Sequence, residues 1–194
     1  MNQNQIPQRV ASVHLIAVCG TGMGALAAAL KEMGLAVTGS DAGVYPPMST
    51  FLESRGIAVS DGFSENNLAH GPDLVVVGNA VKRDNPEAVR MLEMGLPYCS
   101  MPQAINHFMA QNRRTVVVTG THGKTTTASM VAWLLQSAGC DPSFMIGGIL
   151  NNFQANYRVG NGGYMVIEGD EYDTAFFDKE PKFLHYRPDI AIWT

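Results

Sequence analysis

The stretch that most constrains this chain is residues 119–126, with the sequence Thr-Gly-Thr-His-Gly-Lys-Thr-Thr. An apolar run, residues 115–118, precedes it, and a helix-forming segment, residues 127–138, follows. A strand, a glycine turn, a Lys-Thr pair and a helix are the parts of a phosphate-binding loop. In such a loop, backbone amides and the positive end of the helix macrodipole face the phosphate oxygens. The stretch predicts a nucleoside triphosphate site.

Two side chains of this loop have distinct expected roles. Lys124 can reach the outer phosphates, and the Thr125 hydroxyl can bind Mg²⁺. The strict pattern requires a glycine five residues before Gly123, where this chain has Val118, so the loop is a shortened variant. A glycine turn that only caps a helix is the alternative, which the preceding apolar strand disfavours. The predicted nucleotide-binding residues are Gly120, Thr121, His122, Gly123, Lys124, Thr125 and Thr126.

A second glycine turn lies near the start of the chain. Residues 13–19 predict a buried strand, and Gly20-Thr21-Gly22-Met23-Gly24-Ala25 follows it, which is the dinucleotide-binding fingerprint with alanine in the third position. Ser40 and Asp41 end the next expected strand, about 20 positions later, where an acidic residue holds a ribose hydroxyl. The glycines accept the diphosphate of uridine diphosphate as readily as that of a nicotinamide dinucleotide, so the turn alone does not indicate redox chemistry.

The remaining pattern predicts an α/β fold with parallel sheets. Helices are expected over residues 25–33, 49–55, 87–94, 101–111 and 125–138, and strands over residues 13–19, 36–39, 57–59, 73–77, 96–98, 115–118, 143–146, 164–167 and 189–194. Asn85 followed by Pro86 predicts a helix N-terminus. Asn79, just after an expected strand, is either a ligand contact or a turn amide.

Polar segments divide this pattern. The stretch 111–114 predicts a hinge, so that residues 1–112 form one domain and residues 113–194 a second. Gly147 and Gly148 predict a turn, and residues 151–163 a polar connection. The apolar run 189–194 predicts a buried strand. A parallel domain that stops at a strand is incomplete, so we expect the chain to be part of a longer protein.

An acidic cluster follows the strand expected over residues 164–167. Glu168, Asp170, Glu171 and Asp173 place four carboxylates within six residues, and these repel one another unless a cation is near. Mg²⁺ bound with a triphosphate supplies that charge. Because Glu168 directly abuts the strand, we predict that it binds the metal together with Thr125. A solvated acidic turn is the alternative for Asp170 and Glu171.

Composition excludes several classes of protein. The formal net charge of −4 leaves no basic patch of the kind that nucleic acid requires. The three cysteines are far apart and fit small core residues of a cytoplasmic protein. The polar start, residues 1–9, and the lack of an apolar run of roughly 18 residues disfavour a signal peptide and a membrane span. Of the five histidines, only His122 lies in an expected site. Nothing in the sequence specifies an oligomeric state.

Two nucleotide-binding units in series, one for a diphosphate and one for a triphosphate, resemble the Mur ligase family. The segments that carry the resemblance are Gly20-Thr21-Gly22-Met23-Gly24, Gly39-Ser40-Asp41, Asn85-Pro86-Glu87, the loop 119–126, and Glu168-Gly169-Asp170-Glu171-Tyr172-Asp173. They span nearly the whole chain. The shortened phosphate loop is the form that this family uses.

The resemblance implies a Rossmann-like domain that binds a UDP-sugar, followed by the first part of a P-loop ATPase α/β domain. It implies ATP and Mg²⁺ as cofactors, Lys124, Thr125 and Glu168 as catalytic residues, and UDP-sugar binding by Gly20, Thr21, Gly22, Met23, Ser40, Asp41 and Asn79. A histidine for a second magnesium and a carbamylated lysine lie beyond Thr194 in the family. We therefore expect residues 1–194 alone to bind UDP-sugar and to catalyse nothing.

Two branches of the family act on UDP-N-acetylmuramate. One adds L-alanine, and the other attaches the recycled tripeptide L-alanyl-γ-D-glutamyl-meso-diaminopimelate. Residues 41–50, 78–80 and 171–179 resemble the second branch more closely. The alternatives are the L-alanine branch, an NAD(P)-dependent oxidoreductase, which leaves the loop 119–126 unexplained, and a non-enzymatic nucleotide sensor.

Overall fold

The computed structural model describes residues 4–194, so that the first three residues of the polar start lie outside it. Its contacts divide the chain into two units. The first comprises Met1–Ala104 and Thr174–Lys179, and the second Ile105–Asp173 and Glu180–Thr194. The expected division after residue 112 remains a prediction. Within the described part of the chain, no helix combines the length and the apolar character needed to cross a bilayer.

The first unit is built on a five-stranded parallel sheet in the order β3-β2-β1-β4-β5. Its strands are β1 (Ser12–Ile16), β2 (Ala36–Asp41), β3 (Ala58–Asp61), β4 (Leu74–Val77) and β5 (Tyr98–Ser100). Since the strands are parallel, the ends of β1, β2 and β4 meet at one edge, where residues that follow each strand come together. The parallel α/β class expected from the sequence is confirmed.

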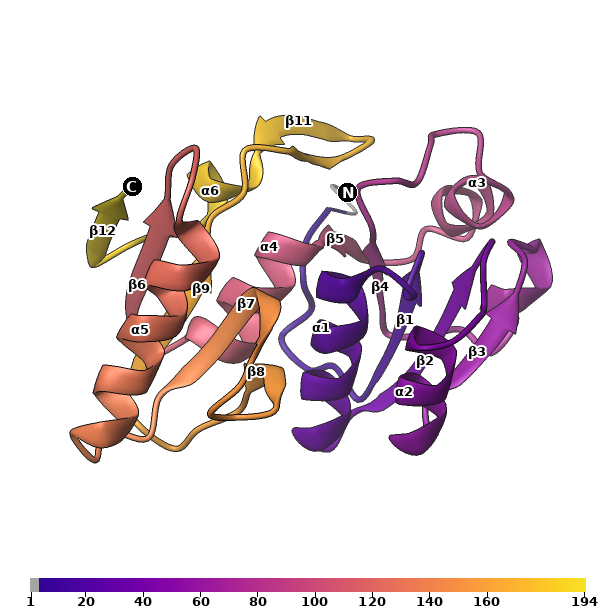
Figure 1. Cartoon of the computed structure of the whole chain (residues 1–194). Coiled ribbons are helices and arrows are strands. Elements are labelled where there is room, and N and C mark those ends of the chain that lie inside the picture. Colours follow the sequence, from indigo (N-terminus) through magenta and orange to yellow (C-terminus); the bar gives the residue numbers. More distant parts are fainter. Residues whose placement is uncertain (1–3) are drawn as a thin grey trace. The chain divides into compact units, whose positions relative to one another are not determined.

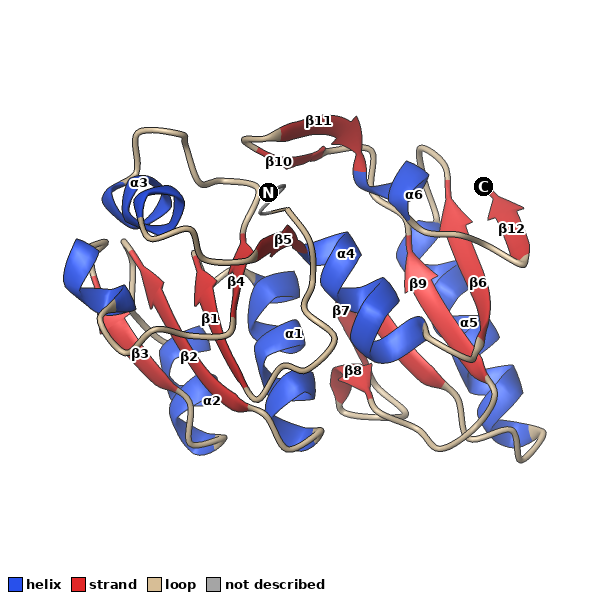
Figure 2. Ribbon diagram, turned by 180° about the vertical axis from the view of Figure 1, so that it is seen from behind, coloured by secondary structure: helices blue, strands red, loops and turns tan. Residues whose placement is uncertain are grey.

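Helices cover both faces of this sheet. They are α1 (Thr21–Glu32), α2 (Met48–Ser54), the 3₁₀ helix η1 (Glu65–Leu68), α3 (Pro86–Glu93) and α4 (Met101–Ala104). Figures 1 and 2 show α1 and α2 on one face and α3 on the other. On the α3 face, Met91 packs with Ile16, Val75 and Val77 in one buried cluster. Burial of this apolar surface is the main favourable term for the unit.

The start of α3 follows directly from three residues. The Asn85 side chain accepts hydrogen bonds from the amides of Glu87 and Ala88, and Pro86 occupies the first helical turn. An N-cap of this kind satisfies amides that have no partner within the helix. The N-terminus predicted at Asn85 is confirmed.

The second unit contains a five-stranded sheet in the order β12-β6-β9-β7-β8, in which only the β7–β8 pair is antiparallel. Its strands are β6 (Arg114–Thr119), β7 (Ser143–Leu150), β8 (Ala155–Arg158), β9 (Tyr164–Glu168) and β12 (Ile190–Trp193). Its helices are α5 (Lys124–Ser137), the π-helix η2 (Ile105–Ala110) and α6 (Lys182–His185). A separate two-stranded sheet, β10 (Asp173–Ala175) and β11 (Asp178–Pro181), has its residues 174–179 in the first unit. Figure 2 shows η2 on the face opposite α5.

Four expectations for the second half of the chain are corrected. Gly147 and Gly148 lie within β7 rather than in a turn, because the strand continues past a register irregularity to Leu150, where it pairs again with β8. The polar connection 151–163 contains β8 itself. The helix expected over 101–111 changes from α to π geometry at Ile105. Finally, β12 is largely exposed, because it is an edge strand that pairs only with β6.

We predict that Met91→Ala destabilises the chain by about 3 kcal/mol, because Met91 is fully buried and its truncation leaves a cavity. Met94, at the end of the same helix, is 37% exposed, and Met94→Ala should cost less than about 1 kcal/mol. Urea unfolding followed by circular dichroism measures both. Equal losses in the two variants would contradict the assignment of Met91 to the core.

Candidate functional site

The loop between β6 and α5 has the backbone of a phosphate-binding turn. β6 ends at Thr119 and α5 begins at Lys124. Gly120 and Gly123 have φ values of 132° and 79°, which disfavour a side chain, and a Cβ atom at Gly120 would overlap the backbone of Thr194. The first amides of a 14-residue helix therefore face the space that the loop surrounds.

Lys124 is positively charged and is oriented by two oxygens. Its Nζ donates to the Gly120 carbonyl at 2.8 Å and to Glu171 Oε2 at 3.0 Å. The hydrogen bond with Glu171 raises the pKa of Lys124, and the same hydrogen bond lowers the pKa of Glu171. Glu171, which the sequence left open as a solvated acid, is therefore an ion-pair partner of the loop lysine.

Thr125 and Glu168 are brought together across the sheet. In the parallel pairing of β6 and β9, Glu168 lies opposite Val118, so Val118 and Glu168 are at the carboxyl ends of adjacent strands. Thr125 follows β6 in the first turn of α5. The Thr125 hydroxyl donates to Glu168 Oε1 at 2.8 Å, and the Gly147 amide donates to Glu168 Oε2 at 2.7 Å. A hydroxyl and a carboxylate oxygen in contact form a hard oxygen donor set, which suits Mg²⁺.

Two glycines of β7 allow the side chains of Thr125 and Glu168 to approach the strand closely. A Cβ atom at Gly147 would lie 3.0 Å from Glu168 Oε2, and one at Gly148 would lie 3.0 Å from the Thr125 methyl carbon. Neither glycine has a positive φ, so the constraint comes from the neighbouring side chains rather than from the backbone.

The acidic cluster separates into individual partnerships. Glu168 contacts Thr125, Glu171 pairs with Lys124, and Asp170 Oδ2 lies 4.0 Å from Lys182 Nζ. Burial raises the pKa of Asp170, whereas Lys182 opposes that shift. Asp173 begins β10. Two lysines therefore offset part of the repulsion among carboxylates that the sequence placed side by side.

A groove of about 360 Å³ lies beside the loop within the second unit. Thr125 and Thr126 line it at the start of α5, and Trp133 and Phe153 contribute aromatic rings whose centroids are 5.8 Å apart. The sequence did not indicate the two aromatic residues, because they lie far apart in the chain and meet only when β7 and α5 pack together.

The first unit has a larger cavity, of about 420 Å³, at the carboxyl ends of β1, β2 and β4. Five residues expected to bind UDP-sugar line it, namely Gly20, Thr21, Met23, Asp41 and Asn79. The other lining residues are Ala17, Cys19, Gly43, Tyr45, Pro47, Met48, Gly78 and Ala80. Gly22 and Ser40 do not line the cavity. A Cβ atom at Gly22 would contact the Met101 side chain, and Ser40 is fully buried.

Asp41 holds the turn that shapes this cavity. Its Oδ2 accepts the Cys19 amide at 2.8 Å, and its Oδ1 accepts the Gly43 amide at 3.2 Å. The carboxylate thus ties the start of the glycine turn after β1 to the turn after β2. The sequence predicted Asp41 as a ligand contact, and its bonds to backbone amides add a structural role that spacing alone did not indicate.

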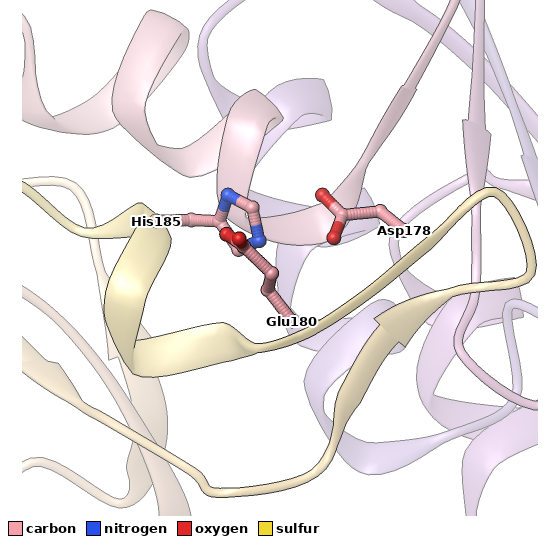
Figure 3. Close-up of side chains that lie close together, drawn as sticks. All are labelled: Asp178, Glu180 and His185. Atoms are coloured by element: carbon pink, nitrogen blue, oxygen red, sulfur yellow. The ribbon is translucent and has the colours of Figure 1, made fainter.

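Figure 3 shows a separate group of three side chains on one stretch of chain, with Asp178 and Glu180 projecting from β11 and His185 from α6. Their ligand atoms lie within 4.8 Å of one another. By their contacts, Asp178 belongs to the first unit and the other two residues to the second, so this group is not a site of either unit.

Two α/β units, each with a glycine turn at the carboxyl ends of parallel strands, have the architecture of nucleotide-binding domains. Residues 12–113 match the Mur ligase family, catalytic domain, and residues 118–194 match the Mur ligase middle domain. The chain belongs to the Mur ligase family, which confirms the resemblance predicted from its motifs.

The curated relatives that the chain matches include two kinds of ligase within this family. The chain is 49% identical over 93% of its length to the UDP-N-acetylmuramate–L-alanyl-γ-D-glutamyl-meso-2,6-diaminoheptandioate ligase of Escherichia coli, and it covers 39% of that protein. It is 40% identical over 98% of its length to a UDP-N-acetylmuramate–L-alanine ligase of Bradyrhizobium, of which it covers 38%. The chain thus spans about two fifths of the curated relatives that it matches.

A solved structure agrees with the sequence relatives. The crystal structure of the UDP-N-acetylmuramate:L-alanyl-γ-D-glutamyl-meso-diaminopimelate ligase from Neisseria meningitides matches with a TM-score of 0.90 and 45% identity. The match covers 96% of this chain and 61% of that one. The murein peptide ligase of Psychrobacter arcticus matches with a TM-score of 0.88 and 46% identity, over 94% of this chain and 42% of that one.

We predict that Cys19 is alkylated slowly at pH 8. Its pKa is raised to about 11 by burial and by the carboxylates of Asp41 and Asp61, so its thiolate fraction is roughly a hundredfold below that of an unperturbed thiol. Asp41→Asn should accelerate the reaction roughly two- to fivefold by removing one negative charge. Peptide mass spectrometry after timed iodoacetamide treatment measures the rate.

The matched control is Asp84→Asn, which removes an exposed carboxylate that does not act on this thiol. A Cys19 that reacts as fast as cysteine in the urea-unfolded chain would contradict the prediction.

Proposed function

We propose that this chain supplies the UDP-sugar site and the ATP-activating loop of a ligase that joins UDP-N-acetylmuramate to the tripeptide L-alanyl-γ-D-glutamyl-meso-diaminopimelate in peptidoglycan recycling in the cytoplasm. The observation that carries the proposal is the contact between Thr125 and Glu168 at the end of a phosphate-binding loop. An oxidoreductase has no use for this second nucleotide site.

The chemistry explains why such a ligase needs a triphosphate. A carboxylate does not condense with an amine at neutral pH, because hydroxide is a poor leaving group. Transfer of the ATP γ-phosphoryl group to the lactyl carboxylate gives an acyl phosphate, which the amine attacks with loss of phosphate. The protein positions the two reactants and offsets the charge that develops.

In the second unit, Lys124 stabilises the outer phosphates, and the amides from Gly120 to Thr126 bind the phosphate oxygens. Lys124 must exchange Glu171 for phosphate as its partner, which is possible because the Glu171 side chain is 55% exposed and can turn into solvent. Before the nucleotide binds, Glu171 is the counterion that holds the Lys124 ammonium beside the loop.

Thr125 and Glu168 hold Mg²⁺ in this proposal. When bound with the nucleotide, the ion supplies positive charge beside the phosphates. The Gly147 amide keeps the Glu168 carboxylate turned toward Thr125, so the two oxygen donors are already in place.

In the first unit, residues 20–23 bind the diphosphate of the UDP-sugar at the start of α1. Asp41 and Asn79 line the same cavity and contact the sugar nucleotide in supporting roles. Ser40 supports the site from beneath, since its side chain is buried.

The peptide-adding branch is favoured over the L-alanine branch by relative similarity, 49% identity against 40%. The L-alanine ligase remains the second candidate, because its relatives match 98% of this chain. The two differ in the amine that they accept. An assay of ADP release by a longer enzyme that contains this chain, with tripeptide or with L-alanine as the amine, distinguishes them, and a preference for L-alanine would reverse the choice.

We expect the chain to bind UDP-N-acetylmuramate at least tenfold more tightly than NADH, because the cavity lies at one five-stranded sheet with one diphosphate turn, whereas a dinucleotide site uses two mononucleotide-binding halves. Isothermal titration calorimetry with each ligand measures the two dissociation constants. A preference for NADH would replace the ligase by an oxidoreductase.

We further predict that Glu168→Gln lowers the affinity for ATP in the presence of Mg²⁺ by roughly tenfold, because it removes the charged metal ligand. Without Mg²⁺, with EDTA present, the variant and the unaltered chain should bind ATP alike. Glu32→Gln, an exposed carboxylate in the other unit, is the matched control. A Mg²⁺ dependence that survives in Glu168→Gln would exclude Glu168 as a metal ligand.

A further inference from the structure

The first unit contains a buried carboxylate, Glu87, that the proposed function does not use. Glu87 lies in the first turn of α3 and its side chain is 0% exposed. Its Oε2 accepts the Ser40 hydroxyl at 2.5 Å and lies 3.3 Å from His14 Nε2. Its Oε1 accepts Asn67 Nδ2 at 2.5 Å and the Ser64 amide at 3.2 Å. Both oxygens are therefore fully engaged.

These bonds connect segments that are distant in the sequence. His14 is in β1, Ser40 ends β2, and Ser64 precedes η1. His14 Nδ1 in turn lies 2.8 Å from the Thr38 hydroxyl, which is 3.3 Å from His70 Nε2. Glu87 is thus the centre of a polar network beneath the carboxyl edge of the sheet.

Burial alone raises the pKa of Glu87, but the hydrogen bonds from His14, Ser40 and Asn67 outweigh it, so the pKa lies below its usual value. The carboxylate is ionised at neutral pH. A buried charge is costly to hold, and removing part of its hydrogen bonding leaves that cost uncompensated.

The network reaches the nucleotide cavity through β2. The Ser40 carbonyl accepts the Val18 amide at 3.0 Å, and the next residue, Asp41, accepts the Cys19 amide. The chain from Val18 to Gly20 enters the glycine turn. Glu87 accepts the Ser40 hydroxyl and so fixes the end of β2. The end of β2 in turn positions the glycine turn after β1, through the bonds to the Val18 and Cys19 amides.

We propose that Glu87 is a positioning residue for the UDP-sugar site: its carboxylate holds Ser40, and thereby Asp41 and the Cys19 amide, in the arrangement that receives the diphosphate. This inference rests on the proposed function of the first unit. It assigns to the Asn85-Pro86-Glu87 segment a role beyond starting α3.

The test compares UDP-N-acetylmuramate binding by the unaltered chain and by Glu87→Gln, using calorimetry well below the unfolding temperature. Glutamine keeps the shape, but whichever way its amide is turned, it presents a donor where Glu87 presents an acceptor. We expect the dissociation constant to rise about tenfold. Ser40→Ala, which removes only the link to β2, should weaken binding in the same direction and keeps the test available if Glu87→Gln does not fold.

Glu93→Gln is the matched control, because Glu93 lies on the same helix, its side chain is 59% exposed, and it pairs with Arg90 at the surface. It should bind within twofold of the unaltered chain. A second measurement, amide hydrogen exchange without ligand, should show faster exchange at Cys19 and Gly43 in Glu87→Gln, with no change at Val117 in the second unit.

The outcomes distinguish a failure of the positioning role of Glu87 from a failure of the proposed UDP-sugar site. If the unaltered chain binds UDP-N-acetylmuramate and Glu87→Gln binds it within twofold, with unchanged exchange at Cys19, Glu87 has only a structural role and the inference is overturned. A lower unfolding temperature with unchanged binding leads to the same conclusion. If the unaltered chain itself does not bind UDP-N-acetylmuramate, the proposed function fails and the inference fails with it.

Discussion

The pairing of parallel strands is the constraint on which both candidate sites depend. In the second unit, the register that places Val118 opposite Glu168 brings the phosphate loop and the acidic strand end to one edge. In the first, the register that places Ile16 opposite Ser40 brings the glycine turn next to Asp41. A shift by one residue in either pair would turn these side chains to the opposite face of the sheet.

Features that are local in the sequence were predictable. The glycine turns, the N-cap at Asn85 and most strands of the two sheets follow from apolar runs and from residues with fixed conformational preferences. Family membership followed as well, because the order of the two loops and the acidic segment is distinctive. The contact between Thr125 and Glu168 could be anticipated for the same reason, since parallel strand ends lie side by side.

Features that depend on distant packing were not predictable. β8 has a polar sequence, Ala-Asn-Tyr-Arg, and is a strand because β7 provides an antiparallel partner. The carboxylate of Glu87 lies 73 residues from His14 in the chain, so no spacing rule could join them. The split of the acidic cluster between Lys124 and Lys182 likewise required the fold, because a run of carboxylates reports its total charge but not the partner of each member.

The two adjacent glycines of β7 have a consequence for how this protein could be altered. Their backbone would accept alanine, so neither position is protected by strand geometry. The space that an alanine methyl group would need is occupied by side chains of the site: the Glu168 carboxylate beside Gly147 and the Thr125 methyl beside Gly148. In a random library screened only for folding, methyl groups at these positions should survive. A screen for nucleotide use should remove them, which makes this dipeptide a marker that separates folded from functional sequences.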